Sequence, residues 1–401
     1  MSFGYRVLGF GQSEISLFPQ ENFALSDELL VDGENALDVI GFALDRHNRG
    51  KGAIAWRDGT NIRVKVFTST TANVITLGST QTLALGANFR GDQDQLAFCG
   101  SNKFVLGYIK NGDNQNSTTN ASCVICTISG TTVTFGSETV IRGAYSNGLQ
   151  IAADQQVDDR IAAQFVTVDG GGYRTKVVAA TISGTTPSFS GMTQLTGDNG
   201  DSQDIDYVNG RCISTFKDHQ NGYDGYATAF SISGNSISAG SNVQYDDILH
   251  AKNAKVRINP NNANEAIVTN LNKSTNAPQL KIATISGTSM SFGNFITVDD
   301  KNVDSAEVRF NKNFEDRILS VYTDEDADAG DPGRAKIKAG LIDGSGITFG
   351  DEQSLASSQS GHGTMLEFDQ HADGADKFFY LYRSDTGNDT AIRIGQMGGR
   401  S

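Results

Sequence analysis

One short phrase recurs along the chain and constrains the fold more than any other feature of the sequence. It reads Thr-Ile-Ser-Gly-Thr, followed within a few residues by Phe and Gly, with clear copies at 127–136, 181–191 and 284–293. Weaker copies at 67–78, 231–240 and 341–350 replace the aromatic residue or the turn glycine. Because Gly supplies the positive φ that tight hairpins need, each copy predicts two antiparallel strands joined by a short turn. A repeat of this kind predicts an array of similar units.

A second marker lies upstream of these copies, where a polar residue and a Lys or Arg precede an apolar run. It occurs as Asn102-Lys103-Phe104, Asp159-Arg160-Ile161, Gly210-Arg211-Cys212, Asp316-Arg317-Ile318 and Asp376-Lys377-Phe378. In the four copies from Lys103 to Arg317 the basic residue precedes the closing glycine by 33, 31, 29 and 33 positions. The two markers therefore belong to one unit, with strands expected, for example, at 149–153, 160–168, 173–182 and 187–189. Four strands in a meander form one blade of a β-propeller.

Six closing glycines, at positions 78, 136, 191, 240, 293 and 350, mark six blades spaced by 49 to 58 residues. A seventh blade has three strands near 365–369, 377–383 and 390–395, but no Phe-Gly strand follows. Met1-Ser2-Phe3-Gly4 matches the end of a repeat, Met290-Ser291-Phe292-Gly293. We therefore expect an all-β, seven-bladed β-propeller of four-stranded antiparallel blades, whose last blade is closed by the N-terminal strand, so that no sheet edge stays unpaired.

The whole chain, 1–401, is interpreted as a single propeller domain, since repeat folds often exceed ordinary domain length. Its 45 Gly and charged fraction of 19% suit many short strands joined by turns. The segment 9–35 is about twenty residues longer than a blade requires. It is interpreted either as a loop packed against the ring or as an N-terminal docking arm.

The two faces of the ring are expected to differ. The turns after the first and third strands lie on one face, which we call the turn face, and the remaining connections lie on the other, the loop face. The basic residues of the second marker should form a ring on the turn face. This candidate assembly face consists of Lys103, Arg160, Arg211, Arg317 and Lys377. Either each pairs with a neighbouring Asp or carbonyl, or the ring docks an acidic partner.

The loop face is the predicted site of partner recognition. Its connections between second and third strands differ in length and sequence from blade to blade, and variable loops on a rigid scaffold usually carry recognition. These connections are 111–121, 169–172, 218–225, 270–278, 324–334 and 384–389.

An acidic stretch provides the candidate metal site. Asp324, Asp326 and Asp328 alternate ahead of Gly330, and carboxylate oxygens at such spacing suit a hard cation such as Ca²⁺. The glycine stands one position later than in the usual calcium loop and no twelfth-position Glu follows, so a solvated acidic loop is the other interpretation. No other cofactor is expected.

The remaining chemistry of the chain is sparse. Cys123 and Cys126 point to opposite faces of one strand and cannot bind one metal together, so all four cysteines are expected to be free and buried. The sequence 343–349 resembles the Asp box of sialidase-like propellers with one residue too many, and that box is a folding element. No nucleophile elbow, zinc motif or phosphate loop appears, so no enzymatic activity is predicted.

Charge and hydropathy exclude some classes of partner. A net charge of −14 argues against nucleic acid, whose phosphates require a basic surface. No stretch approaches the ~20 apolar residues that span a bilayer, so no membrane insertion is expected. The N-terminus also lacks the pattern of a signal peptide, so the chain is expected to be made in the cytoplasm of the producing cell and used as translated.

The Thr-Ile-Ser-Gly-Thr…Ser-Phe-Gly repeat and the opening 2–11, Ser-Phe-Gly-Tyr-Arg-Val-Leu-Gly-Phe-Gly, resemble repeat-rich virion proteins of tailed bacteriophages, particularly marine ones. The resemblance covers most of the chain and carries over no functional residue. It implies a non-enzymatic structural or adhesive component of the particle, such as a tail, fibre or capsid-surface part. Its partners would be other virion proteins and a host-surface glycan or protein. The alternative is a propeller that binds or hydrolyses cell-surface polysaccharide.

Overall fold

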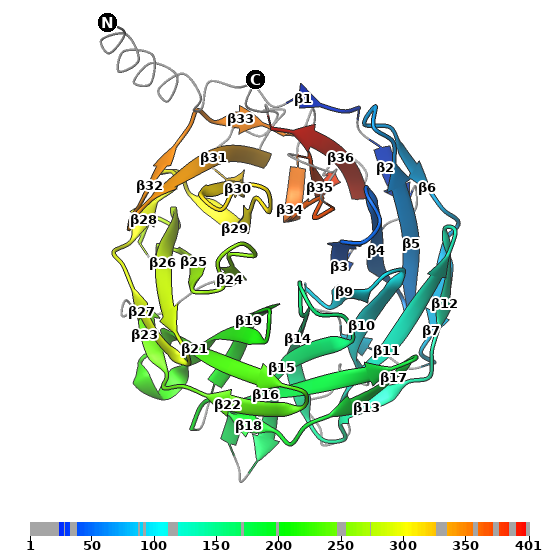
Figure 1. Cartoon of the computed structure of the whole chain (residues 1–401), viewed down its shortest axis with the longest axis horizontal. Helices are drawn as coiled ribbons and strands as arrows, with labels where there is room; N and C mark the ends of the chain where they lie inside the picture. Colours follow the sequence, from blue (N-terminus) through cyan, green and yellow to red (C-terminus); the bar gives the residue numbers. More distant parts are fainter. Residues whose placement is uncertain are drawn as a thin grey trace, which may run out of the picture.

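Seven antiparallel sheets stand around a central axis in the computed structural model of the chain, as Figure 1 shows from blue to red. The structure describes residues 24–27, 29–32, 38–86, 89–90, 94–110, 119–169, 172–197, 200–246, 254–272, 274–325, 335–355, 360–371, 377–384 and 390–397. The predicted all-β, seven-bladed β-propeller is confirmed.

Each blade runs outward from the axis through four strands. Blade 1 contains β3 (Asp38–Leu44), β4 (Lys51–Asp58), β5 (Asn61–Ser69) and β6 (Ile75–Leu77). Blade 2 contains β9 (Leu96–Gly100), β10 (Lys103–Lys110), β11 (Asn120–Ser129) and β12 (Thr132–Phe135), with β8 (Phe89–Arg90) also pairing with β10. Blade 3 contains β14 (Ser146–Ala153), β15 (Arg160–Asp169), β16 (Gly172–Ser183) and β17 (Thr186–Phe189). The four strands of blade 3 agree closely with those expected from the markers.

The other four blades repeat the pattern. Blade 4 contains β19 (Gly200–Val208), β20 (Arg211–Asp218), β21 (Asp224–Ser233) and β22 (Ser236–Ala239). Blade 5 contains β24 (Lys255–Ile258), β25 (Glu265–Leu271), β26 (Pro278–Ser286) and β27 (Ser289–Phe292). Blade 6 contains β29 (Val303–Phe310), β30 (Arg317–Asp324), β31 (Ala335–Asp343) and β32 (Gly346–Phe349). Blade 7 contains β34 (Ser360–Phe368), β35 (Lys377–Ser384), β36 (Thr390–Gln396) and β1 (Ala24–Leu25).

A short additional strand, which the repeat pattern did not predict, pairs with the third strand of every blade. These strands are β7 (Gln81–Ala84), β13 (Thr139–Arg142), β18 (Thr193–Gln194), β23 (Val243–Asp246), β28 (Ile296–Thr297), β33 (Gln353–Ser354) and β2 (Leu29–Asp32). The one described helix is a 3₁₀ turn, η1 (His219–Asn221), and no described helix is long and apolar enough to cross a membrane.

The core lies between blades because second strands are apolar on both faces. In β10, Phe104 and Leu106 pack toward blade 1, whereas Val105 and Ile109 pack toward blade 3. Successive strand residues point to opposite faces, so one apolar strand fills two inter-blade layers. Figure 1 shows these blades side by side around the ring.

The cysteines follow the same rule. Cys123 and Cys126 lie in the two different layers that β11 separates, and all four cysteines are free and buried, as expected. Burial raises the pKa of Cys99 and Cys123 to about 12, which keeps these thiols protonated and unreactive.

The ring closes through an N-terminal strand, but the strand differs in position from the one expected. In the other blades the residue after the outer strand donates its backbone N–H to the third strand. These donor–acceptor pairs are Gly78–Val66, Gly136–Ile125, Ser190–Ala179, Gly240–Ala229, Gly293–Ile282 and Gly350–Ala339. In blade 7 the donor is Ser26, whose N lies 2.8 Å from Ile394 O.

The closing position is therefore filled by β1, and β2 takes the place of the additional strand. Met1-Ser2-Phe3-Gly4, the segment predicted for this role, lies outside the described residues. Part of the segment 9–35 is accounted for, because it contains both closing strands, β1 and β2. For the rest of 9–35, packing loop or docking arm stays a prediction.

The third-to-fourth strand turns of blades 2 to 6 are uniform, as expected. Gly130, Gly184, Gly234, Gly287 and Gly344 all have φ between 59° and 61°, a left-handed conformation that Gly adopts at no steric cost. Gly344 lies in the segment that resembles an Asp box. Its place in this set shows that 343–349 forms the same hairpin as its counterparts.

Candidate functional site

Charged side chains meet at the axis of the ring, a feature that the repeat markers did not reveal. The innermost strands carry Asp204 and Asp206 in β19, Lys255 and Arg257 in β24, and Glu307 and Arg309 in β29. Each pair is separated by one residue, so both members point to the same side of the strand. The alternation Asp-x-Asp, Lys-x-Arg and Glu-x-Arg was the sequence signal that could have found this cluster.

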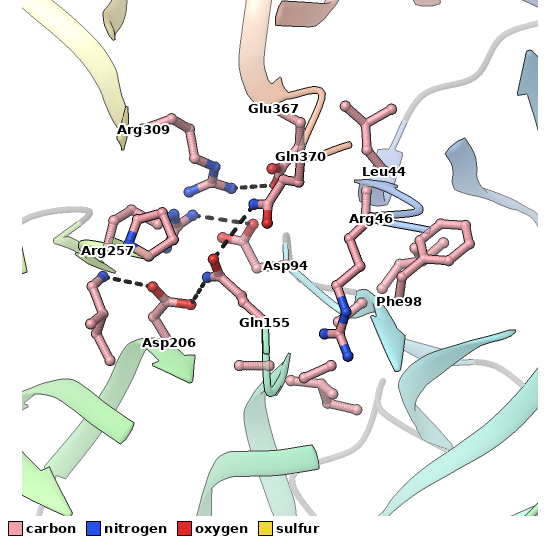
Figure 2. A pocket seen from close by; sticks show the side chains of 18 of the residues that line it. Leu44, Arg46, Asp94, Phe98, Gln155, Asp206, Arg257, Arg309, Glu367 and Gln370 are labelled. Carbon is pink, nitrogen blue, oxygen red and sulfur yellow. Dashed lines mark hydrogen bonds and ion pairs between the residues drawn. The ribbon is translucent and has the colours of Figure 1, made fainter. Parts of the chain in front are cut away.

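Ion pairs join this cluster across and around the ring. Lys255 in blade 5 pairs with Asp94 in blade 2, on the far side of the axis, and Arg257 pairs with Asp204. Arg257 Nη2 lies 2.6 Å from Glu307 Oε1, and Arg309 Nη2 lies 2.8 Å from Glu367 Oε1. Figure 2 shows Arg309 and Arg257 directed at carboxylates from other blades.

The cluster holds more carboxyl groups than cations. Its five carboxyl groups are Asp94, Asp204, Asp206, Glu307 and Glu367, and its cations are Lys255, Arg257 and Arg309. Burial raises the pKa of Glu307 and of Glu367 to about 8, and that of Asp206 to about 6. Burial alone would also raise the pKa of Asp94, but attraction to Lys255 and Arg257 outweighs it and lowers that pKa.

A cavity of about 110 Å³ adjoins the cluster and is lined by residues from all seven blades. Side chains of the turn face reach across it. Gln155 Nε2 donates to Asp206 Oδ1 at 2.8 Å, and Gln370 Nε2 lies 3.5 Å from Gln155 Oε1 (Figure 2). Arg46 bonds to the backbone of Asp154 and pairs with Asp158, two blades away. The Gln155–Gln370 and Arg46–Asp158 contacts therefore tie non-adjacent blades together at this end of the axis.

The predicted basic ring lies at the starts of the second strands. Lys103 pairs with Asp159 of the next blade. Lys377 Nζ lies 3.1 Å from Thr71 O, and Arg211 Nη1 lies 2.8 Å from Ala263 O, again across a blade junction.

The two remaining members of the basic ring, Arg160 and Arg317, also lie at the starts of second strands. The Arg317 guanidinium lies 4.4 Å from the centre of the Phe314 ring and is almost fully buried, and Arg160 begins β15. The contacts of Lys103, Arg211 and Lys377 are those of the pairing interpretation, and docking of an acidic partner stays a prediction.

Only Asp324 of the predicted metal ligands lies in the described part of the chain. Its carboxylate is buried, and its Oδ2 lies 2.9 Å from Lys301 Nζ. Asp326 and Asp328 lie outside the described residues, so the calcium site stays a prediction. Elsewhere in the described ranges, no group of three His, Cys, Asp or Glu side chains is arranged to hold a metal ion.

Two aromatic pairs stand on the loop face, where partner recognition was predicted. Tyr145 and Tyr173 of blade 3 meet edge to face, with ring centres 5.6 Å apart. The ring centres of His219 and Tyr223 in blade 4 lie 4.4 Å apart. Tyr173 and Tyr223 are each 41% exposed, which is high for such large side chains.

Ion pairs and capping bonds hold these loops in place. Asp169 pairs with both Arg142 and Lys176 beside Tyr173. In blade 4, Asp218 caps η1 by accepting from Gln220 N at 3.0 Å, and its backbone O accepts from Tyr223 N at 3.0 Å.

Comparisons with known proteins show the architecture. No family model and no curated protein matches the sequence. The structure is similar to BP39L lectin from Burkholderia pseudomallei (TM-score 0.61, 10% identity, 90% of this chain and 97% of that one). It is also similar to Sqt1 from Chaetomium thermophilum (0.52, 11%, 92% and 85%) and to Hadza microbial sialidase Hz136 (0.49, 11%, 84% and 73%). At such low identities the likeness to BP39L lectin and to Sqt1 shows the fold alone.

Proposed function

We propose that this chain is a non-enzymatic adhesive and structural propeller that recognises its partner through the loop face. The observation that carries this proposal is the presence of exposed aromatic side chains, Tyr173 and Tyr223, on pinned hairpins of that face. Tyrosine is enriched at recognition surfaces because it offers a large rigid contact area with a polar end. The shared architecture with a lectin, BP39L, agrees with surface recognition.

The axial cluster favours a structural role over hydrolysis. A glycosidase needs two carboxyl groups that flank a sugar bond, with room for the sugar between them. Here Glu307 and Glu367 are bound to arginines, and the adjoining cavity of about 110 Å³ is smaller than the ~300 Å³ at which ligand pockets usually begin. Polysaccharide hydrolysis is therefore the weaker candidate.

The proposed setting is a bacteriophage particle, which rests on the resemblance of the repeats. There the loop face would contact a host-surface glycan or protein, and the turn face would contact other virion proteins. Mass spectrometry of purified particles of the encoding phage tests this setting. We expect the chain at stoichiometric abundance, together with binding of the purified protein to host cells. A chain that is absent from the particles would refute the virion role.

Charge reversal tests the assembly face. Lys103→Glu, Arg211→Glu and Lys377→Glu together should weaken incorporation into particles, provided that circular dichroism shows a folded ring. The check of folding is needed because each of these residues also joins two blades. A folded triple variant that assembles normally would refute docking through this face.

A further inference from the structure

The blade 4 loop carries a compact group of aromatic and hydrogen-bonding side chains at the junction with blade 3. We call Asp201, His219, Tyr223, Asp224, Tyr226 and Gln244 the blade 4 platform. Phe216 and Tyr226 stack with ring centres 6.1 Å apart and planes 16° apart. Phe216 is buried in the layer between blades 3 and 4, so the platform stands on rigid packing.

Tyr223 is held in an unusual backbone conformation. Its φ is 70°, directly after Gly222 at 82°. A bulky residue in the left-handed region costs about 1 kcal/mol or more relative to glycine, so the tyrosine at this position carries a local conformational penalty. The conformation places a 41% exposed ring beside His219 at the tip of the hairpin.

The neighbouring polar groups are held by one another. His219 Nε2 lies 2.8 Å from Asp201 Oδ2, which fixes the imidazole against the Tyr223 ring. Gln244 Nε2 donates to Asp224 Oδ2 at 2.7 Å beside Tyr226. Such prior ordering lowers the entropy that a ligand must overcome on binding.

We propose that the blade 4 platform binds a neutral sugar residue of a surface glycan, with the C–H face of the sugar stacked on Tyr223. An aromatic face with a few oriented polar groups suits a molecule that is apolar on its faces and polar at its edges. The carboxylates of Asp201 and Asp224 accept hydrogen bonds from sugar hydroxyls and repel anionic ligands, which selects against sialylated or uronic-acid sugars. This inference rests on the proposed adhesive function and deepens it.

A glycan array and a matched set of variants test this site. The full-length protein is applied to neutral oligosaccharides ending in glucose, galactose, mannose or N-acetylglucosamine, and to sialylated ones, followed by calorimetry with the best ligand. Tyr223→Phe should retain affinity. Tyr223→Gly removes the ring, relieves the backbone strain and should weaken binding about tenfold or more. Val74→Ala, which trims a 57% exposed apolar side chain in the turn between β5 and β6 of blade 1, on the opposite face, is the control and should bind normally.

The outcomes separate the site from the function. Loss of binding in Tyr223→Gly alone, with a neutral ligand, supports the proposal. Equal binding by wild type and Tyr223→Gly, or preference for sialylated glycans, overturns this site while adhesion stands. Binding to host cells that survives removal of their glycans identifies a protein receptor and overturns the sugar inference. Failure to bind both glycans and host cells overturns the adhesive function too.

Discussion

In five of the blades, one buried residue at the end of the first strand holds the turn that follows it. Its side-chain oxygen accepts a hydrogen bond from the backbone N–H two positions later. The pairs are Asp45 with His47, Asp154 with Gln156, Asn259 with Asn261, Asn311 with Asn313, and Asp369 with His371. Three of these residues also accept from N–H groups of the next blade, Asp45 from Asn102, Asp154 from Gly210 and Asp369 from Gly50. Asn259 reaches the next blade as a donor, through its Nδ2 to Glu315 O at 2.8 Å.

Replacement of Asp154 should be strongly destabilising. The carboxylate is fully buried and accepts from four backbone N–H groups, two in its own turn and two in blade 4. Asp154→Ala leaves these donors without that acceptor, so we expect a loss of about 3 kcal/mol or more in unfolding free energy by denaturant titration. Asp158→Ala, which removes an exposed partner of Arg46, should cost less than about 1 kcal/mol. Equal losses would contradict the assigned role of Asp154.

At the scale of the element, the closing strands β1 and β2 decide whether the ring is complete. They pair with β36 and cover an edge that would otherwise expose unpaired backbone groups. Ser26 makes three bonds there, since its N–H, O and Oγ all bond to residues 393 and 394. The only tryptophan, Trp56, is buried in the layer between blades 7 and 1 and reports on this seam.

Ser26→Pro should therefore loosen the seam. Proline removes the N–H that bonds to Ile394 O, together with the hydroxyl, and we expect a loss of about 2–4 kcal/mol. Tryptophan fluorescence should shift to the red at lower denaturant than the loss of β-sheet circular dichroism. Ser26→Gly keeps the N–H and should cost about 1 kcal/mol. If the fluorescence of Ser26→Pro matches that of the wild type at every denaturant concentration, β1 does not stabilise the closure.

At the scale of the whole molecule, the axial cluster links strands that no sheet pairing connects. Lys255 and Asp94 belong to blades 5 and 2, and Arg257 contacts carboxylates from two neighbouring blades. Buried ion pairs add little net stability, but removal of one partner leaves a costly buried charge. The cluster therefore fixes how the blades meet at the axis, and its excess of carboxyl groups makes stability depend on pH.

We expect stability to fall as pH rises from about 4.5 to about 8. Burial raises the pKa of Glu307 and Glu367 to about 8 in the folded chain, against an ordinary value of 4.5. Between these values the folded state holds protons that the unfolded state has released, so raising the pH favours unfolding until the folded pKa is passed. Asp299 has a pKa of about 2 in the folded chain, below its ordinary value, so its contribution to stability is lost only as the pH falls below about 4.

Calorimetry at pH about 5.5 and about 8.5 measures this dependence. Glu307→Gln keeps an oxygen for Arg257 and removes the titrating proton, so its unfolding temperature should fall less over this interval. An identical fall in wild type and variant would show that Glu307 is not responsible.

The sequence by itself determined the repeating unit, the blade number and which connections lie on the turn face and on the loop face. Hairpin glycines, apolar second strands and basic markers act over a few residues, so local pattern suffices to place the strands. The opposite-facing Cys123 and Cys126 followed from the same local rule.

Tertiary structure alone decided which segment closes the ring and what fills its axis. Leu25-Ser26 lacks the Phe-Gly signature, yet β1 satisfies the edge of β36 because pairing depends on backbone groups rather than side chains. The pairing of Asp94 with Lys255, 161 positions apart, exists only because seven blades converge on one axis. The blade 4 platform likewise depends on how Asp201, His219 and Tyr223 meet at a hairpin tip, which no spacing in the sequence encodes.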